Sequence, residues 1–173
     1  VLTTLDVTGN SKLLQAMQQQ SFTMPFTYTS FDSYSPVMIS TAGESASQGL
    51  MVGVPFDPLN ENNPAGNLYL QQLQTYEPGG AGSSGFGFLT WEAVQMLVYC
   101  LIASGHNPTR ASITKVASGL QNWTGGGALG AYTPSTHGVS PCVVDMVVKG
   151  ADFVRKAPDS GLFCGGQLVQ ASS

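Results

Sequence analysis

Residues 120–164 decide the fold of this chain and read LQNWTGGGALGAYTPSTHGVSPCVVDMVVKGADFVRKAPDSGLFC. The pattern predicts a helix that ends at Leu120, a glycine run at 125–127, and two short β segments around the turn at residues 149–152. We found no catalytic motif in this stretch. The stretch therefore indicates the architecture of the chain, in which a closing β hairpin follows a group of helices.

Composition narrows the class of protein. The 173 residues fit one domain or a large piece of a bigger one, and 42% of them are hydrophobic. Only 9% are charged, against about 25% in ordinary soluble domains, so Ser, Thr, Gln, Asn and Gly must cover the surface, as is more common in secreted proteins. A net charge of −4 with six scattered Lys and Arg argues against nucleic acid as a partner. No run approaches the roughly 18 apolar residues that cross a bilayer.

The first third of the chain alternates strand and helix patterns. Strands are predicted at residues 1–5, 25–29 and 49–55, and helices at 12–20 and from Pro36 to about 42. Thr8, Asn10 or Ser11 could cap the first helix. The nearly continuous apolar character of residues 49–55 suits a strand that is covered on both faces, as in parallel α/β sheets.

Three helices without strands of their own are predicted after Pro55, at residues 64–76, 88–104 and 108–120. The second is apolar almost all round and should be deeply buried. The order of elements predicts an α/β fold with a largely parallel sheet flanked by helices and closed by the β hairpin. The broad apolar faces of the three helices must rest on a sheet that is not encoded here, or on a partner.

The three cysteines suggest one disulfide. Cys142 and Cys164 flank the predicted hairpin, and a bond between them would close a modest loop; two free thiols are the alternative. Cys100 lies in an apolar helix, which favours a buried free thiol. We found no Cys-x-x-Cys pair or His/Cys cluster that indicates zinc, and we expect no metal and no cofactor.

Nearly the whole chain resembles a known family. Its order of elements is similar to the C-terminal half of bacterial extracellular solute-binding proteins of ABC transporters with the type I periplasmic fold, of the branched-chain amino-acid receptor kind. The segments that carry the resemblance are the helix LLQAMQQQ at 13–20, AGESASQGLMV at 42–52, Asn63-Pro64, WEAVQML at 91–97 and GGGALG at 125–130. Each motif is weak by itself, and the match depends on their shared order and spacing.

The resemblance implies an architecture and a function. In such proteins a solute binds in a cleft between two α/β lobes joined by three chain crossings, and the loaded receptor meets a membrane permease. Residues 1–56 would belong to the second lobe, 57–121 to the helical part of the first lobe, and 122–173 to the second lobe again. We therefore expect a C-terminal fragment that packs on the missing N-terminal half or on a second chain. We also expect an extracellular or periplasmic location and an anchor in a missing N-terminal segment.

Ligands of open α/β folds sit beyond the carboxyl ends of the strands. The loops at those ends predict a binding site in which hydroxyls and carboxylates orient the solute and aromatic rings provide contact area; ordinary loop residues are the alternative. The candidates from this lobe are Thr3, Thr4, Asp6, Ser30, Phe31, Asp32 and Tyr34, and Phe86 or Phe88 could line the other side of the cleft.

One departure from the family pattern bears on the solute. Relatives that bind amino acids place a carboxylate after the second strand, where it pairs with the ligand ammonium. By register that position falls near Ser30 in this chain, and Asp32 lies two residues further on. Either Asp32 takes the role or the ligand is not an α-amino acid, and we favour the second alternative.

Two other classes of function are alternatives. A serine hydrolase would need a Gly-x-Ser-x-Gly turn between a strand and a helix, and the segment GSSG at 82–85, with Ser83 and Ser84, does not match it. His137 is better explained as a surface turn residue. A secreted adhesion module is the other alternative, and the sequon Asn122-Trp123-Thr124 fits it by pattern alone.

Overall fold

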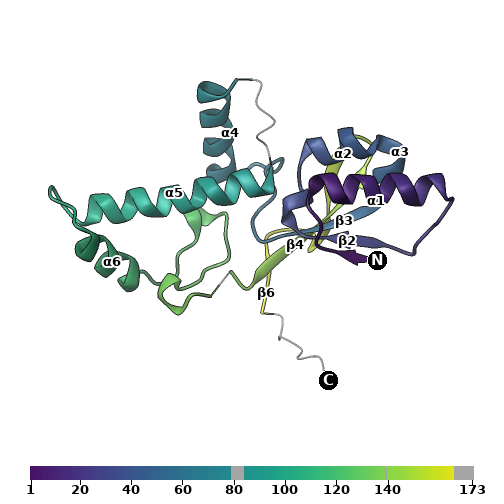
Figure 1. Ribbon diagram of the computed structural model, residues 1–173. Helices are drawn as coiled ribbons and strands as arrows, with labels where there is room; N and C mark the ends of the chain where they lie inside the picture. The colour runs from purple at the N-terminus through teal and green to yellow at the C-terminus, as the bar shows by residue number, and fades with distance from the viewer. Residues whose placement is uncertain (79–83, 139, 166–173) are drawn as a thin grey trace.

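The structure, a computed structural model, describes residues 1–78, 84–138 and 140–165 (Figure 1). Its strands are β1 (Leu2–Thr3), β2 (Thr27–Thr29), β3 (Leu50–Val54), β4 (Cys142–Lys149), β5 (Asp152–Ala157) and β6 (Phe163–Cys164). Its α-helices are α1 (Val7–Gln19), α2 (Pro36–Ala42), α3 (Glu44–Ser47), α4 (Pro64–Tyr76), α5 (Gly85–Ala103) and α6 (Arg110–Gly119). Three 3₁₀ turns join them: η1 (Phe31–Ser33), η2 (Gly125–Gly127) and η3 (Pro134–Thr136).

The strands form one mixed sheet in the order β1-β2-β3-β4-β5, with β6 paired to β4. Strands β1, β2 and β3 run parallel, as their βα connections require. Strand β4 runs antiparallel to β3, with Val52 opposite Met146, and then turns back into β5. The sheet confirms the predicted α/β class, with its parallel strands and its closing hairpin.

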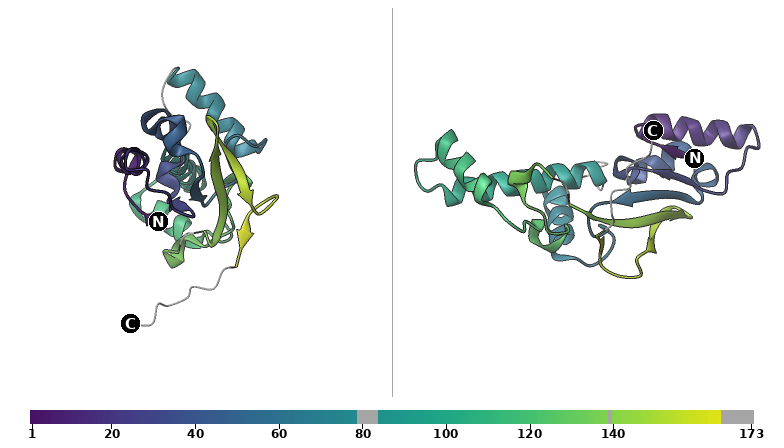
Figure 2. Two further views of the ribbon diagram at one scale, coloured as in Figure 1. Left: turned by 90° about the vertical axis from the view of Figure 1, so that its right-hand side faces the viewer. Right: turned by 90° about the horizontal axis from the view of Figure 1, so that it is seen from below.

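One face of the sheet holds the core. The side chains that point to this face from β3 and β4 are at most 2% exposed, and Leu14, Met38 and Ile39 from α1 and α2 pack on them. Figure 2 shows α1, α2 and α3 on this same side. The residues are Leu50, Val52, Val54, Val144, Met146 and Val148.

The opposite face of the sheet is only half-buried. Burial alternates along β3, so that Met51 and Gly53 are half-exposed between fully buried neighbours. The expectation that this strand is covered on both faces was therefore wrong for the described residues, because their helices α1–α3 all lie on one side of it. Tyr28 crosses this open face and donates a hydrogen bond from its hydroxyl to Asp145 Oδ1, at 2.7 Å.

A row of aromatic rings joins the sheet to the helices beyond it. The ring centroid of Tyr34 lies 4.9 Å from that of Phe153 in β5 and 5.9 Å from that of Phe56. Phe56 in turn lies 4.9 Å from Phe88 of α5, and Phe88 lies 5.4 Å from Tyr69 of α4. Offset and edge-on pairs of this kind contribute beyond their buried area. The row makes a single core out of segments far apart in the sequence.

The helices begin where side chains cap their free N–H groups. Asn63 accepts a hydrogen bond from Gly66 N at 2.6 Å and Pro64 follows it, so α4 has the predicted bounds. The first helix begins at Val7, earlier than predicted, because Asp6 is its cap and accepts from Gly9 N at 2.6 Å. The candidate caps Thr8, Asn10 and Ser11 lie inside this helix instead.

Helix α5 was predicted to be deeply buried, and within the described residues it is not. Val94, Leu97, Val98 and Tyr99 are 41–49% exposed and Ile102 is 76% exposed. Figure 1 shows α5 as a long rod that extends away from the sheet, with α6 at its far end. By length and composition, its 19 residues could cross a membrane, which corrects the expectation that no segment could. The described residues supply no layer that covers this side of the helix.

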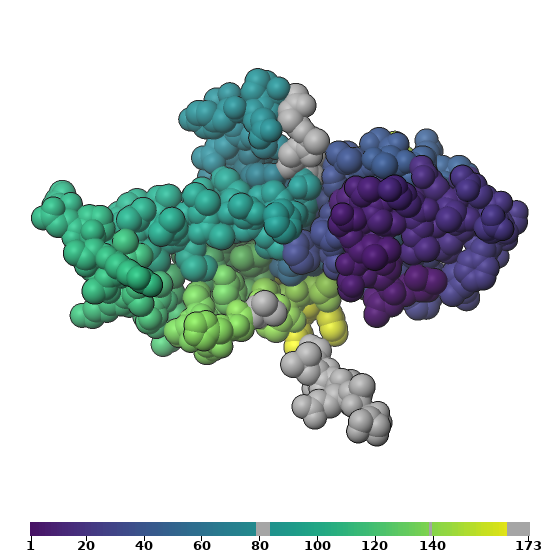
Figure 3. Space-filling model, viewed as in Figure 1, coloured from purple at the N-terminus to yellow at the C-terminus, as the bar shows by residue number. Residues whose placement is uncertain are grey.

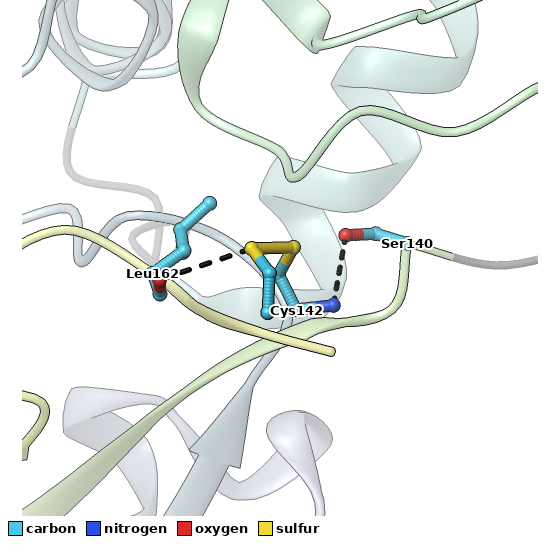
Figure 4. The surroundings of a disulfide bond; sticks show 4 residues. Ser140, Cys142 and Leu162 are labelled. Carbon is cyan, nitrogen blue, oxygen red and sulfur yellow. Dashed lines mark hydrogen bonds between the residues drawn. A yellow bond between two sulfur atoms is a disulfide. The ribbon is translucent and has the colours of Figure 1, made fainter. Parts of the chain in front are cut away.

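The predicted disulfide is present. Cys142 of β4 and Cys164 of β6 are directly opposite each other in the sheet and are bonded, with their Cα atoms 4.1 Å apart (Figure 4). Ser140 Oγ accepts a hydrogen bond from Cys142 N at 3.4 Å. Cys100 is a buried free thiol, as expected.

Arg155 of β5 ties the hairpin to the segment that leads from the sheet to α4. Its Nε and Nη2 donate to the two carboxylate oxygens of Glu61 at 2.8 and 2.6 Å, and Asp57 lies 3.7 Å from Nη2. The hydrogen bond to Glu61 raises the pKa of Arg155. Burial raises the pKa of Asp57; Arg155 opposes this shift and Glu61 adds to it. The planar guanidinium suits such a two-point contact, which an ammonium group cannot reproduce.

Gly53 is required by the side chain that crosses it. A Cβ atom at this position would overlap the hydroxyl of Tyr28. Gly53→Ala should therefore lower the free energy of unfolding in urea by about 1–3 kcal/mol. Combined with Tyr28→Phe, it should cost less than the sum of the two single changes, because both disturb one contact. Gly119→Ala, in open space at the end of α6, is the control and should be neutral; equal effects at both glycines would contradict the prediction.

The Arg155 contact should depend on the shape of the guanidinium. Arg155→Ala should lower the free energy of unfolding by about 1–3 kcal/mol, and Arg155→Lys should recover only part of it. Amide hydrogen exchange should become faster at residues 57–63 in both variants. Lys156→Ala removes a neighbouring exposed cation and is the control. The same loss in this control, or full recovery by lysine, would show that a positive charge is sufficient and that the planar shape of the guanidinium does not matter.

Candidate functional site

The loops after β1 and β2 lie side by side because the two strands are adjacent and parallel. Buried Asn10 joins them. Its Oδ1 accepts from Thr3 Oγ1 at 3.0 Å, and its Nδ2 lies 2.6 Å from the carbonyl oxygen of Leu5, 2.9 Å from Thr29 Oγ1 and 2.8 Å from Ser33 Oγ. A buried amide that is satisfied from both loops holds them in one arrangement. Sequence reasoning treated Asn10 only as a possible cap.

The polar candidates gather at this edge of the sheet with different exposures. Thr3 is half-buried, whereas Thr4 and Asp6 are exposed, and Asp6 also caps α1. Ser30 and Asp32 are half-buried, and the Ser30 hydroxyl donates to Asp32 Oδ1. The two loops thus lie side by side at this edge of the sheet, with Asp32 as the carboxylate next to Phe31.

Phe31 lines a hollow of about 470 Å³ between the sheet and α5. One side is formed by Phe31, Gly53 and Val143 at the sheet, and the other by Leu89 of α5 and by the chain that returns to β4. The remaining lining residues are Pro55, Leu129, Tyr132, Gly138 and Ser140. Its walls are mostly apolar, and Tyr132 and Ser140 contribute hydroxyl groups.

The start of α5 is held tightly against the loop after β2. Gly85 N donates to the carbonyl oxygen of Tyr34 at 2.8 Å, and a Cβ atom at Gly85 would overlap the carbonyl oxygen of Phe31. Ser84 caps the helix and accepts from Gly87 N at 3.0 Å. This close approach places Leu89, one turn into the helix, across the hollow from Phe31.

The aromatic candidates are divided between core and surface. Phe88 is fully buried and Tyr34 is 5% exposed, and both belong to the aromatic row. Tyr34 donates from its hydroxyl to Asn60 Oδ1 at 3.3 Å, and burial raises its pKa to about 12. Phe86 is 65% exposed. These positions give Phe88 and Tyr34 packing roles, and we do not include them among the residues proposed to touch a solute.

Sequence reasoning missed Leu89, Tyr132 and Ser140. Leu89 belongs to an apolar helix whose buried and exposed sides the sequence does not distinguish. Tyr132 is placed by a bridge to Trp123, with Trp123 N 2.8 Å from the Tyr132 carbonyl oxygen. Burial raises the pKa of Tyr132, and the charge of Glu92 adds to this. Only the folded chain brings this return segment to the hollow.

The hollow can hold a small molecule with an apolar body, because most of its wall is hydrocarbon and a few hydroxyls can fix orientation. The Asp32 carboxylate next to Phe31 adds a negative charge in the adjoining loop. In the part of the chain that the structure describes, we found no group of three or more His, Cys, Asp or Glu side chains that could hold a metal ion. Ser83, considered for a hydrolase, lies outside the described residues.

Known structures share this fold. A leucine-binding protein from Thermotoga maritima is 18% identical with a TM-score of 0.70, over 90% of this chain and 43% of that protein. A branched-chain amino-acid ABC transporter protein from Thermus thermophilus, solved with bound valine, is 15% identical with a TM-score of 0.69, again over 90% and 43%. A possible leucine/isoleucine/valine-binding protein from Rhodopirellula baltica is 19% identical with a TM-score of 0.72, over 85% and 39%.

The chain spans about two fifths of the length of these three proteins. The comparison with curated protein sequences gave no match. The model of the family described as periplasmic binding protein matches residues 1–152, which is most of the chain and includes strands β1–β4, the loops after β1 and β2, and helices α1–α6. The chain belongs to the periplasmic binding protein family.

Proposed function

We propose that this chain is the C-terminal part of the substrate-binding component of an ABC-type importer. It would capture a small solute in the cleft between two lobes and deliver it to a membrane permease. The observation that carries the proposal is the hollow between Phe31 and Leu89, at the carboxyl ends of the parallel strands. Residues 1–56 and 122–173 would form the second lobe and 57–121 the helical part of the first.

The hollow favours a solute with an apolar body. The wall of the hollow is mostly hydrocarbon, and the ring of Phe31 forms part of it. The structural relatives include proteins described as binding leucine, valine or isoleucine. In this chain Ser30 donates to Asp32, so one carboxylate oxygen of Asp32 already has a partner. We therefore keep our preference for a solute without an α-ammonium group, such as a branched carboxylic acid.

We propose a location outside the cytoplasm and a role without a catalytic step. A disulfide between Cys142 and Cys164 is typical of an oxidising compartment. Ser84 serves as the cap of α5, which accounts for this serine without a nucleophilic role. The other wall of the cleft would come from the N-terminal half or a second chain, and a membrane anchor would lie upstream. Solute, permease and that further part of the receptor are the proposed partners.

Phe31 should contribute directly to affinity. We expect Phe31→Ala, in the complete receptor, to weaken solute binding by about 10- to 100-fold, because losing buried contact with an aromatic ring removes about 1.5–3 kcal/mol. Isothermal titration calorimetry measures this after a screen of branched carboxylic acids and amino acids identifies the solute. Phe22→Ala is the matched control, since Phe22 is 54% exposed and belongs to neither the core nor the hollow. Equal affinities for wild type and Phe31→Ala would contradict the proposed site.

The choice between amino acid and acid depends on Asp32. We expect isocaproate to bind at least as tightly as leucine, which has the same branched body and an added ammonium group. Tight binding of leucine that Asp32→Ala abolishes would show the reverse, with Asp32 as the partner of the ammonium group. Asp152→Ala, which changes an exposed carboxylate on β5, controls for net charge.

A further inference from the structure

The Cys142–Cys164 disulfide lies beside one wall of the hollow at Phe31. More than half of the residues that line this hollow belong to the start of β4 and to the return segment, which leads from α6 back to β4. They are Leu129, Tyr132, Gly138, Ser140 and Val143. Cys142 is the first residue of β4, directly before Val143, and is only 4% exposed. The disulfide thus connects this wall of the hollow to β6.

The sulfur of Cys142 packs against the return segment. A Cβ atom at Gly130 would overlap Cys142 Sγ, so this sulfur lies against the backbone one residue after Leu129. Cys142 N also donates a hydrogen bond to Ser140 Oγ at 3.4 Å (Figure 4). The direction of the sulfur is fixed, because it is bonded to Cys164. Cys142 therefore contacts the wall on two sides, and the disulfide holds it in that position.

Strand β6 is short and exposed. It has two residues, both exposed, and it pairs with β4 at Cys142 and Val143. In the space-filling view, the yellow atoms that include β6 lie at the surface beside the green atoms of β4 (Figure 3). The turn before β6 has its own anchor, since Arg155 Nη1 donates to the carbonyl oxygens of Pro158 and Gly161 at 3.2 and 2.6 Å. Breaking the disulfide would therefore leave this turn in place and free β6 from β4.

We propose that the Cys142–Cys164 bond positions the wall of the hollow, so that the receptor binds its solute tightly only while the bond is oxidised. This inference rests on the proposed function, in which the hollow is the solute site. Both cysteines are positioning residues, because neither lines the hollow and they act through Leu129 and Ser140. A covalent bond is effective here because it removes conformations in which the sulfur of Cys142 moves away from Gly130, and an ordered wall costs less to complete on binding.

The chemical event is an exchange between the disulfide and a dithiol reductant. One thiolate of the reductant attacks Cys164 Sγ, and Cys142 leaves as a thiolate that takes up a proton. The second thiol of the reductant then releases Cys164 as a thiol and closes a cyclic disulfide. Two electrons and two protons pass from the dithiol to the protein. Cys164 is the exposed member of the pair, so its sulfur is the one open to attack.

The test measures binding of isocaproate and of leucine to the complete receptor, by isothermal titration calorimetry well below the Tm of every form. Reduction of the wild type with dithiothreitol should weaken binding by about 10-fold, because a loosened wall must be ordered again when the solute binds. The double variant Cys142→Ala, Cys164→Ala should bind as weakly as the reduced wild type and should not respond to dithiothreitol. This lack of response would assign the effect to this disulfide and to no other thiol of the receptor.

Gly130→Ala tests the contact through which the disulfide acts. The φ of Gly130 is not positive, so alanine suits the backbone, but its Cβ atom would crowd Cys142 Sγ. We expect weaker solute binding in the oxidised receptor and a smaller further loss in the double cysteine variant, because both changes disturb one contact. Phe163→Ala is the matched control. It alters β6 next to the bond, at a side chain that is 57% exposed, and should leave the affinity unchanged.

A disulfide that only stabilises the fold would give different results. Its reduction would lower the Tm of the receptor and leave the solute affinity unchanged, and this outcome would overturn the inference. An equal loss of affinity in Phe163→Ala would also overturn it, since the pairing of β6 would then matter as much as the bond.

Amide hydrogen exchange without solute separates this inference from the proposed function. Reduction should make exchange faster at residues 129–132 and 140–143 and leave it unchanged along β3, because only the wall beside the bond is released. Faster exchange at the wall, with no form of the receptor binding either solute, would reject the proposed function and leave the positioning of the wall standing. Unchanged exchange at the wall on reduction would reject the positioning role, whatever the solute affinity.

Discussion

The row of aromatic rings from Phe153 through Tyr34 and Phe56 to Phe88 is the interaction on which the rest of the structure depends. It is the continuous apolar contact between the sheet and α5. Without it, the helices after Pro64 would lose the ring contacts that link them to the sheet. Because rings pack at defined distances and angles, the row also fixes where α5 begins, and so brings Leu89 opposite Phe31.

Around this row, hydrogen bonds, an ion pair and a disulfide hold the loops and the hairpin near the candidate binding site. Asn10 holds the loops after β1 and β2 together from inside the fold. Arg155 and the Cys142–Cys164 bond hold the hairpin against the segments that lead to and from the helices. The lining of the hollow is almost entirely apolar and offers contact area to a solute. The surrounding polar contacts and the disulfide set the shape of the hollow.

The same physical rule explains both the candidate site and the unfinished surface. Apolar faces and buried polar groups are stable only when they pack against or pair with other groups. The described helices α1–α3 cover one side of the sheet only. The described helices leave one face of β3 and one side of α5 uncovered, and the chain spans about two fifths of the length of the structural relatives. Their features differ. The Tyr28–Asp145 contact crosses the open side of β3, whereas Glu92 of α5 and Trp123 of the return segment have buried polar atoms with no hydrogen-bond partner among the described residues.

The sequence by itself determined what depends on neighbours along the chain. Capping residues and prolines fixed α4 to within a residue, the β periodicity gave the hairpin, and two cysteines at its ends gave the disulfide. It also placed Phe31 and Asp32 in the loop after β2, at the edge where the ends of the parallel strands meet. Only the tertiary structure decided that Asn10 is buried, that Phe88 and Tyr34 belong to the core, and that Leu89, Tyr132 and Ser140 complete the hollow. These facts depend on contacts between distant segments, and local pattern carries no information about which side of an apolar helix will find a partner.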